Sequence, residues 1–294
     1  MSPSNPRAKF RAILNGNTCI SPASVFDPIS ARIAEQLGFE LGMLAGSTAS
    51  LAVLGAPDLL LITLTEFAEQ ARRICRAMAL PLLVDADHGY GNALNVERTI
   101  AELESAGVAA ATIEDTMLPA AFGASGKSAL ISIDEGRGKM RAALTARRDE
   151  SFAVVGRTSA PIICGIEDTV QRLAAYEQAG VDALFIVGLK SIADLEIIAQ
   201  ATSLPLILGN AGGDLEGADL AAYRVRILLQ GHLPIMAAAQ AVYDTLKALR
   251  DGKKPAEISN SNWTQLMRGV TQAKDYDQKA RLYLSPGAGG SRTP

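Results

Sequence analysis

The sequence predicts a (β/α)8 barrel, because short apolar runs alternate with longer amphipathic stretches along most of its 294 residues. A doubly wound open sheet is the alternative, but it usually has fewer strands, and no Gly-x-Gly-x-x-Gly follows the first predicted strand. Eight aliphatic or β-branched runs predict strands, at residues 18–21, 42–45, 82–85, 110–114, 153–157, 183–187, 206–208 and 226–229. Helical patterns follow most of them, at residues 27–37, 64–79, 95–106, 133–146, 166–179, 191–202 and 235–249.

Two regions fall outside this alternation. Residues 117–134 form a long Gly- and Ser-rich insertion after the fourth strand, and long loops at that end of a barrel are often lids. A helix predicted over residues 263–283 has no strand before it, so its Leu- and Trp-bearing face needs cover, for which another subunit is a natural source. We therefore expect a barrel over residues 1–253 and a helical extension over 254–294 that ends in a frayed tail from residue 285.

Composition excludes several classes of protein. A net charge of −3 provides no basic field for nucleic acid. Cys19, Cys75 and Cys164 are odd in number and lack metal-site spacing, which argues against a disulfide framework and against a zinc site. The first fifteen residues are polar and basic, and the longest apolar runs are too short to cross a bilayer, so we expect a cytoplasmic protein without a membrane partner.

The third predicted strand carries the most informative residues. It runs from Leu82 into Asp85-Ala86-Asp87-His88-Gly89-Tyr90-Gly91, so two acids follow a buried apolar segment directly. Isolated buried carboxylates are costly unless they are paired or bind metal. Asp85 and Asp87 lie two apart, so on an extended strand they would point the same way, as suits a hard cation such as Mg²⁺. The alternative is a helix N-cap in a solvated turn, which the abrupt exit from an apolar strand makes the weaker interpretation.

Polar residues also end the other predicted strands, where barrel enzymes assemble their sites. The polar loops that follow any parallel strand explain Ser47 well, but explain less well three acids and Arg157 at the ends of strands three, four and five. Asp85, Asp87 and Glu114 would hold Mg²⁺, with Mn²⁺ as a possible substitute, and Arg157 and Ser47 would bind substrate carboxylates. A metal so placed stabilises an enolate, which suits decarboxylation, retro-aldol cleavage or phosphonate chemistry on a 2-oxo acid. His232, one of only two histidines, would bind a distal carboxylate or relay a proton, whereas His88 would brace its turn.

The chain resembles the isocitrate lyase/phosphoenolpyruvate mutase superfamily over almost its full length. The residues that carry the resemblance are Gly46-Ser47 with Ser50, Ala56-Pro57-Asp58, Asp85 to Gly91, Ile113-Glu114-Asp115 and Arg157-Thr158. The resemblance implies that Asp58, Asp87 and Glu114 contact the metal through waters and that Asp85 is the central metal-associated residue. It also implies that barrel helix eight is exchanged between subunits and that the assembly is a homotetramer built as a dimer of dimers.

Within the superfamily, the chain is most similar to the bacterial oxaloacetate decarboxylase branch. It shares Ser24 to Pro28, His88 to Val96 and the strand-eight histidine, His232, with that branch. The loop at residues 118–126 lacks both the Cys and His of the lyases and the Lys and Asn of the mutases and phosphonopyruvate hydrolases. Leu208 stands where the branch places a tyrosine, which is a departure from the pattern.

We therefore expect Mg²⁺-dependent decarboxylation of oxaloacetate to pyruvate and CO2 by a carboxy-lyase. Asp85, Arg157 and His232 would be its catalytic residues. The alternatives are a C–C lyase or C–P bond enzyme acting on a related 2-oxo or 2-hydroxy acid, and a non-catalytic dicarboxylate-binding barrel.

Overall fold

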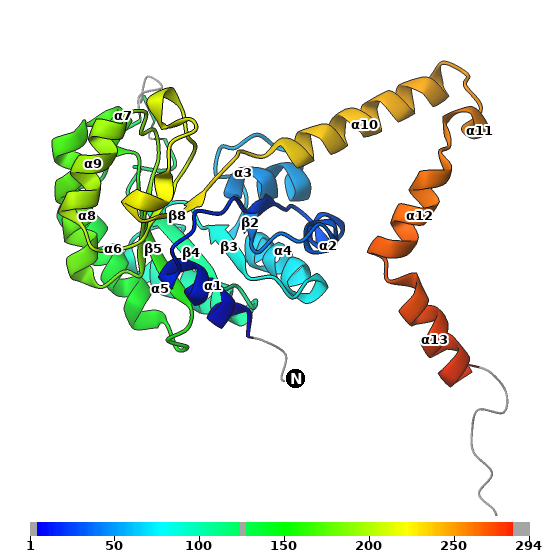
Figure 1. The fold of residues 1–294 in the computed structure, drawn as a ribbon, viewed down its shortest axis with the longest axis horizontal. Coiled ribbons are helices and arrows are strands. Elements are labelled where there is room, and N and C mark those ends of the chain that lie inside the picture. The colour runs from blue at the N-terminus through cyan, green and yellow to red at the C-terminus, as the bar shows by residue number, and fades with distance from the viewer. Residues whose placement is uncertain (1–4, 121, 124–127, 285–294) are drawn as a thin grey trace, which may run out of the picture. The chain divides into compact units, whose positions relative to one another are not determined.

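Eight parallel strands pair in chain order and form the curled sheet of a (β/α)8 barrel, as the sequence predicts (Figure 1). A parallel β-bridge between Ile20 and Ile227 connects the segment before the first strand to the last strand. The Ile20 amide donates to the Arg226 carbonyl (3.0 Å), and the Leu228 amide donates to the Ile20 carbonyl (2.9 Å). The strands are β1 (Ala23–Ser24), β2 (Gly42–Leu44), β3 (Leu82–Asp85), β4 (Ala110–Glu114), β5 (Ala153–Thr158), β6 (Ala183–Ile186), β7 (Leu206–Leu208) and β8 (Val225–Leu228).

This computed structural model describes residues 5–120, 122–123 and 128–284. The predicted tail at 285–294 and part of the predicted 117–134 loop lie outside the described residues. The α-helices are α1 (Pro6–Asn15), α2 (Pro28–Gln36), α3 (Gly46–Ala49), α4 (Leu64–Ala77), α5 (Ala93–Ser105), α6 (Ile133–Ala146), α7 (Ala160–Ile163), α8 (Ile166–Ala179), α9 (Ile192–Ala201), α10 (Leu233–Arg250), α11 (Pro255–Ile258), α12 (Ser261–Val270) and α13 (Ala273–Leu284). A π-helical segment, η1 (Ser50–Leu54), and two 3-10 turns, η2 (Gly213–Leu215) and η3 (Leu220–Tyr223), complete the elements.

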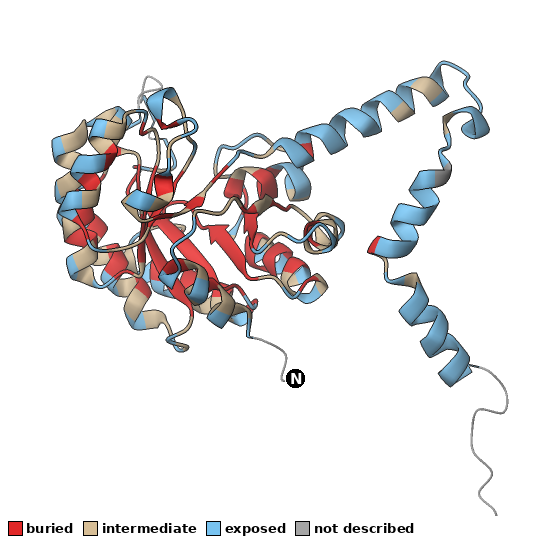
Figure 2. Cartoon of the chain, in the orientation of Figure 1, coloured by how far each residue is buried: buried red, intermediate tan, exposed pale blue. Residues whose placement is uncertain are grey.

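The strands alternate between two apolar layers, because successive side chains of a strand point to opposite faces. Leu82, Val84 and Leu208 pack outward, in the layer between strands and helices, whereas Leu83 and Ile207 pack inward, along the barrel axis. Figure 2 shows the buried strands at the centre of this part of the chain. Inward-facing positions near the carboxyl ends of the strands are therefore the ones that can form a site.

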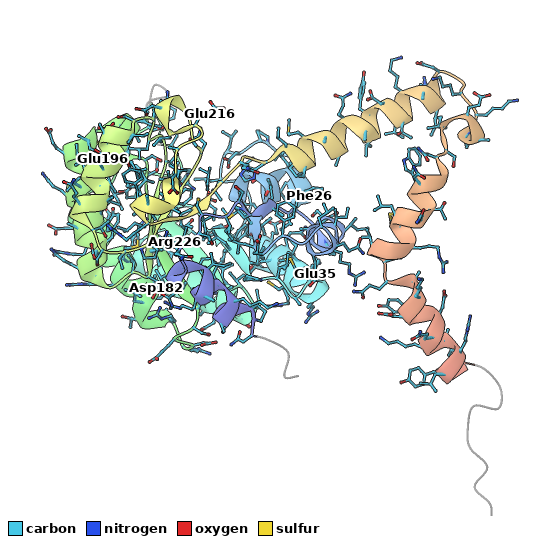
Figure 3. All side chains as sticks on the ribbon, viewed as in Figure 1. Phe26, Glu35, Asp182, Glu196, Glu216 and Arg226 are labelled. Carbon is cyan, nitrogen blue, oxygen red and sulfur yellow. The ribbon has the colours of Figure 1, made fainter. Side chains whose placement is uncertain are left out.

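Helix α1 closes the amino-terminal end of the barrel and was not predicted. Phe10 and Leu14 are buried in the inner layer. Arg11 forms an ion pair with Asp182 (2.5 Å; Asp182 is labelled in Figure 3) and also donates to the carbonyls of Ser151 and Phe152, just before β5. The helix therefore covers the amino-terminal end of the barrel, which is the end opposite the carboxyl ends of the strands.

Two predicted elements were wrong in detail. The first strand is Ala23–Ser24 rather than residues 18–21, where Ile20 alone makes a bridge. The helix predicted over 263–283 is two helices, because Gln272 between α12 and α13 has a left-handed backbone (φ +54°) that an α-helix does not accommodate.

Contacts divide the chain into two units, Met1–Ile235 and Met236–Pro294. The division falls inside α10, whereas the predicted boundary between residues 253 and 254 lies in the turn that follows α10. Among the described residues of the second unit only Val270 is buried. Exposed apolar side chains on its part of α10 include Met236, Val242, Tyr243 and Leu246. No helix in the described part of the chain is both long and apolar enough to span a membrane.

Candidate active site

A cavity of about 350 Å³ collects every site residue that the sequence predicts. Its lining includes Ser47, Asp58, Asp85, Asp87, Glu114, Arg157 and His232. The described lining also includes residues that were not predicted as site residues: Ala45, Leu60, Thr116, Leu118, Ser128 and Ser159. The seven predicted residues come from separate parts of the sequence and meet because the carboxyl ends of parallel strands share one end of the barrel.

Asp85, Glu114 and Arg157 continue the inward-facing alternation of their strands. Asp85 follows Leu83 on β3, and Glu114 pairs in register with Arg157 across β4 and β5. The Arg157 guanidinium forms ion pairs with Asp85 and, at 3.5 Å, with Glu114. The three charged groups therefore form one cluster on the barrel axis, above the apolar inner layer.

Two threonine hydroxyls orient these carboxylates. Thr112, which pairs in register with Asp85, donates from Oγ1 to Asp85 Oδ1 at 2.8 Å, and Thr116 donates to Glu114 Oε2 at 2.7 Å. Neither threonine was predicted from the sequence. The signal for Thr112 was a hydroxyl two residues before Glu114, on the inward face of an otherwise apolar strand.

Asp87 reaches the cavity by a route that the sequence analysis described wrongly. Strand β3 ends at Asp85, and Asp87 adopts a left-handed backbone (φ +48°), so the two acids do not share a strand face. The turn instead carries the Asp87 carboxylate over the start of α3, where a Cβ added to Gly46 would lie 2.4 Å from Asp87 Oδ2. Gly46 is therefore required for this approach.

The acids perturb one another. Burial, reinforced by Asp85 and Glu114, raises the pKa of Asp87 to about 9. Burial also raises the pKa of Glu114 against the opposing effect of Arg157, and it raises the pKa of Asp58, helped by Asp85. Four carboxylates around one guanidinium therefore form a site that favours an additional positive charge.

His232 follows β8 and faces the acids from the other side of the barrel. Its Nδ1 lies 2.9 Å from Ser24 Oγ on β1, which fixes the orientation of the ring. Burial lowers the pKa of His232 and so favours the neutral imidazole, although Asp85 and Asp58 oppose the shift. The cavity thus places an imidazole opposite a carboxylate cluster.

The donor set fits a divalent metal ion by its chemistry. In the described residues no three His, Cys, Asp or Glu side chains form a ready ligand set around one point, and Arg157 supplies the positive charge of the cluster. Asp87 Oδ2, however, is buried and has no hydrogen-bond partner among the described residues, and four carboxylates line the same cavity. Oxygen-only donors with a preference for added positive charge are what Mg²⁺ requires.

Some residues of interest lie outside the cavity lining. Leu208 is fully buried in the outer layer between strands and helices and is not among the described residues that line the cavity. Tyr223 donates to Glu196 (3.2 Å) at the surface. In the part of the chain that the structure describes, Nδ1 of the buried His88 ring has no hydrogen-bond partner. The His88 main-chain carbonyl instead connects the turn to its surroundings, because it accepts a hydrogen bond from Lys139.

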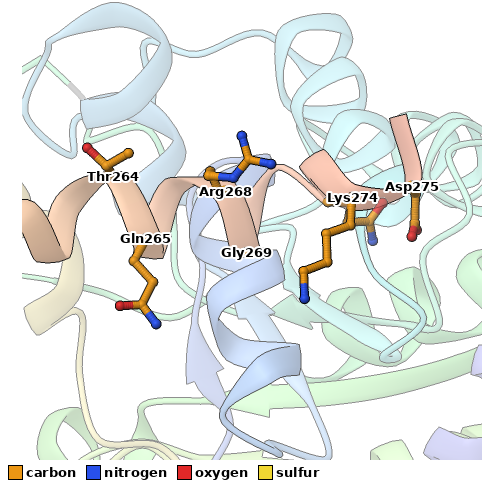
Figure 4. A pocket seen from close by; sticks show the side chains of 7 residues that line it. Thr264, Gln265, Arg268, Gly269, Lys274 and Asp275 are labelled. Carbon is orange, nitrogen blue, oxygen red and sulfur yellow. The ribbon is translucent and has the colours of Figure 1, made fainter. Parts of the chain in front are cut away.

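A second hollow, of about 720 Å³, lies along α12 and α13 (Figure 4). Its lining includes the exposed residues Thr264, Gln265, Arg268, Lys274 and Asp275. None of the predicted site residues lines it. Although it is larger than the barrel cavity, the second hollow lacks a converging set of buried catalytic groups.

The chain is similar to known proteins both in sequence and in fold. The family model for phosphoenolpyruvate phosphomutase matches residues 10–250. An oxaloacetate decarboxylase of Bradyrhizobium diazoefficiens is 59% identical over 276 residues, covering 94% of this chain and 95% of that protein. A phosphonopyruvate hydrolase solved with oxalate and Mg²⁺ superimposes with a TM-score of 0.81 at 29% identity, covering 96% of this chain and 100% of the other. An oxaloacetate acetylhydrolase in complex with 3,3-difluorooxalacetate also has a TM-score of 0.81, at 28% identity, over 98% of this chain and 99% of that one.

The chain therefore belongs to the phosphoenolpyruvate phosphomutase family, within the PEP mutase/isocitrate lyase superfamily that the sequence resembles. The match spans the barrel and α10.

Proposed function

We propose that this protein is a Mg²⁺-dependent decarboxylase of oxaloacetate that forms pyruvate and CO2. The observation that carries the proposal is one small cavity containing four carboxylates, Arg157, Ser47 and His232, in a chain 59% identical to an oxaloacetate decarboxylase. A volume of about 350 Å³ lies at the lower end of the range for ligand sites and suits a four-carbon dicarboxylate.

Asp85, Asp87, Glu114 and Asp58 would hold Mg²⁺, directly or through waters, and Mn²⁺ could replace it. When bound, the metal would polarise the keto group and stabilise the negative charge of an enolate. Support comes from the orphaned Asp87 oxygen, the excess of carboxylates over cations, and the Mg²⁺ in the related phosphonopyruvate hydrolase structure.

The protein side chains would orient the bond that breaks. Arg157 and Ser47 would hold the 2-oxo carboxylate, and His232 would face the departing carboxylate. Cleavage of the bond between the methylene carbon and that carboxylate releases CO2 and leaves the electron pair on the enolate. A proton added to the methylene carbon, by way of His232 or water, completes pyruvate.

The described part of the loop after β4 argues against a retro-aldol C–C lyase. It contributes Thr116, Leu118 and Ser128 to the cavity, none of which is a strong acid or base at neutral pH. Both reactions protonate the enolate carbon, but retro-aldol cleavage must also remove a hydroxyl proton, for which decarboxylation has no need.

The test is pyruvate release from oxaloacetate at fixed Mg²⁺, compared with the enzyme-free rate because free metal alone decarboxylates this substrate. We expect wild-type protein to accelerate release, and both EDTA and Asp85→Ala to abolish the acceleration while circular dichroism stays unchanged. Asp85→Ala also removes the acceptor of Thr112 and Arg157, so a loss of at least 100-fold is expected. Retained activity in a folded Asp85→Ala variant would contradict the metal assignment.

We also propose that the protein assembles as a homotetramer, a dimer of dimers, by exchange of α10 between subunits. The support is that Met236 to Leu284 bury only Val270 while exposing a series of large apolar side chains. Monomeric proteins rarely leave so much apolar surface in water.

A further inference from the structure

Three consecutive carbonyls in the turn after β3 each accept a hydrogen bond from a different element. The Glu114 amide of β4 donates to the Asp87 carbonyl at 2.8 Å. Lys139 Nζ of α6 donates to the His88 carbonyl at 2.9 Å, and Thr99 Oγ1 of α5 donates to the Gly89 carbonyl at 3.0 Å. Three independent anchors hold a segment in which Asp87, Gly89 and Tyr90 all have positive φ.

Lys139 is the unusual member of this set. It lies on the core-facing stripe of α6 with Gly136, Met140 and Ala143, and only 3% of its surface is exposed. Lysine is almost never fully buried unless it is paired, because its ammonium group must leave water. Yet within the described part of the chain Lys139 forms no ion pair, and its hydrogen-bond partner is the His88 main-chain carbonyl.

The electrostatic surroundings explain how such a charge is tolerated. Burial lowers the pKa of Lys139, while Glu135, Glu114 and Asp115 raise it. Glu114 belongs to the carboxylate cluster of the cavity, which contains four acids and one guanidinium. The ammonium thus adds a positive charge that Glu114 senses, although Lys139 is not among the described residues that line the cavity.

We propose that Lys139 is a positioning residue for the metal site: its ammonium fixes the His88 carbonyl, holds Asp87 in its left-handed conformation, and offsets the charge of the acids from outside the cavity. The inference rests on the proposed Mg²⁺ site. A merely structural buried residue would be replaceable by an apolar one of the same length, and Lys139→Met tests that alternative directly.

Two effects are expected from Lys139→Met. Removing the ammonium relieves its desolvation cost but leaves the His88 carbonyl without its donor, so the variant should still fold in EDTA, with a melting temperature at or somewhat below that of wild type. Loss of the anchor and of the charge should weaken metal binding at least tenfold, since partners behind metal ligands typically contribute ~10–100-fold in affinity. The same loss should accelerate amide hydrogen exchange at residues 86–91 in the metal-free protein.

The experiment measures Mn²⁺ binding by electron paramagnetic resonance, and hydrogen exchange in EDTA, for wild type, Lys139→Met, Thr99→Val and Arg141→Met. Arg141→Met is the matched control, because it removes one positive charge from an exposed position of the same helix. Thr99→Val removes a neighbouring anchor without changing charge. We expect wild-type affinity for Arg141→Met, a smaller loss for Thr99→Val, and the largest loss for Lys139→Met.

The possible outcomes separate the two proposals. Mn²⁺ binding by wild type that Asp85→Ala abolishes, together with unchanged binding by folded Lys139→Met, would overturn the positioning role and leave the metal site intact. No binding by wild type would overturn both. Should Lys139→Met fail to fold, Lys139→Gln is judged by the same criteria, and failure of both to fold would make Lys139 a purely structural residue.

Discussion

Asp87 illustrates how a single residue can reduce stability for the sake of binding. Its carboxylate is buried beside Asp85 and Glu114, has one oxygen without a partner, and sits on a left-handed backbone. Each of these features costs folding free energy. Positions of this kind are common at functional sites, where stability and activity conflict.

Asp87→Asn should stabilise the metal-free protein, increasingly so as the pH rises. The pKa of Asp87 in the native state is raised to about 9, above its value in the unfolded state. Between about pH 4 and about pH 9 the native state therefore keeps a proton that the unfolded state has lost, so the free energy of unfolding falls as the pH rises. Asparagine does not titrate and escapes that loss. We expect a gain of about 1–3 kcal/mol at pH 8 and little gain at pH 4.

Thermal unfolding in EDTA at both pH values measures this difference, at one protein concentration. Mn²⁺ affinity, measured in parallel, should fall by at least tenfold in Asp87→Asn because a ligand charge is lost. A variant less stable than wild type at pH 8 would show that Asp87 is well accommodated without metal.

At this scale the sequence predicts residues better than it predicts their partners. Asp85, Glu114 and Arg157 could be found because polar side chains at the ends of apolar strands have no packing role. Asp58 was identified only by resemblance, since Pro57-Asp58 reads equally well as a turn. Ser24, Thr112 and Lys139 could not be assigned, because their roles depend on which elements approach one another in the fold.

At the scale of elements, α1 shows how the barrel is closed at the end remote from the site. Phe10 is fully buried in the inner apolar layer, and the arginines of α1 hold the helix against the segments preceding β4 and β5. The helix starts with an Asn5 cap and Pro6, which are recognisable start signals. The helix was not predicted because its basic residues obscure the apolar pattern. Their partners are carbonyls and acids that approach them only in the folded barrel.

Phe10→Ala should therefore destabilise the barrel without altering its chemistry. Removing a fully buried aromatic ring typically costs about 3–5 kcal/mol. Urea unfolding at fixed protein concentration should show a lower midpoint, while kcat below the transition stays within about twofold of wild type. Lys9→Ala, on the half-exposed side of the same helix, is the control and should change stability by less than about 1 kcal/mol. A large fall in kcat for folded Phe10→Ala would mean that α1 influences the opposite end of the barrel.

The strands show where periodicity succeeds and where it fails. Strands β3 and β4 match their predicted bounds because each is a buried apolar run ended by acids. The first strand was misplaced because two residues, Ala23–Ser24, provide too little pattern to detect. The stronger run at 18–21 contributes only the Ile20 bridge that joins the barrel ends.

At the scale of the whole molecule, the two units differ in how much of their apolar surface they bury. Residues up to Ile235 have two apolar layers and a polar cavity at one end of the axis. The described residues from Met236 to Leu284 form helices in which almost no residue is buried. A segment with that much exposed apolar surface is stable only if another surface covers it.

A second copy of the chain is the partner we expect, and Leu246→Glu tests it. Leu246 is 61% exposed on α10, beside Val242 and Trp263, with which it lines a small apolar hollow. A charge there would have to be buried in any assembly that covers α10, at a cost of several kcal/mol. Lys253→Gln, in the turn after α10, changes net charge by the same one unit and is the control.

Sedimentation velocity at micromolar concentration measures the result. Wild type and Lys253→Gln should sediment as species of about four times the 30.8 kDa chain mass. Leu246→Glu should show a lower sedimentation coefficient, which corresponds to dimers or monomers. Because the predicted site residues all lie before Ile235, residual activity in dissociated Leu246→Glu would show that one barrel suffices for chemistry. Loss of activity with dissociation would mean that exchange of α10 stabilises the cavity. A wild-type monomer would contradict the helix exchange itself and leave the apolar face of α10 for a different partner.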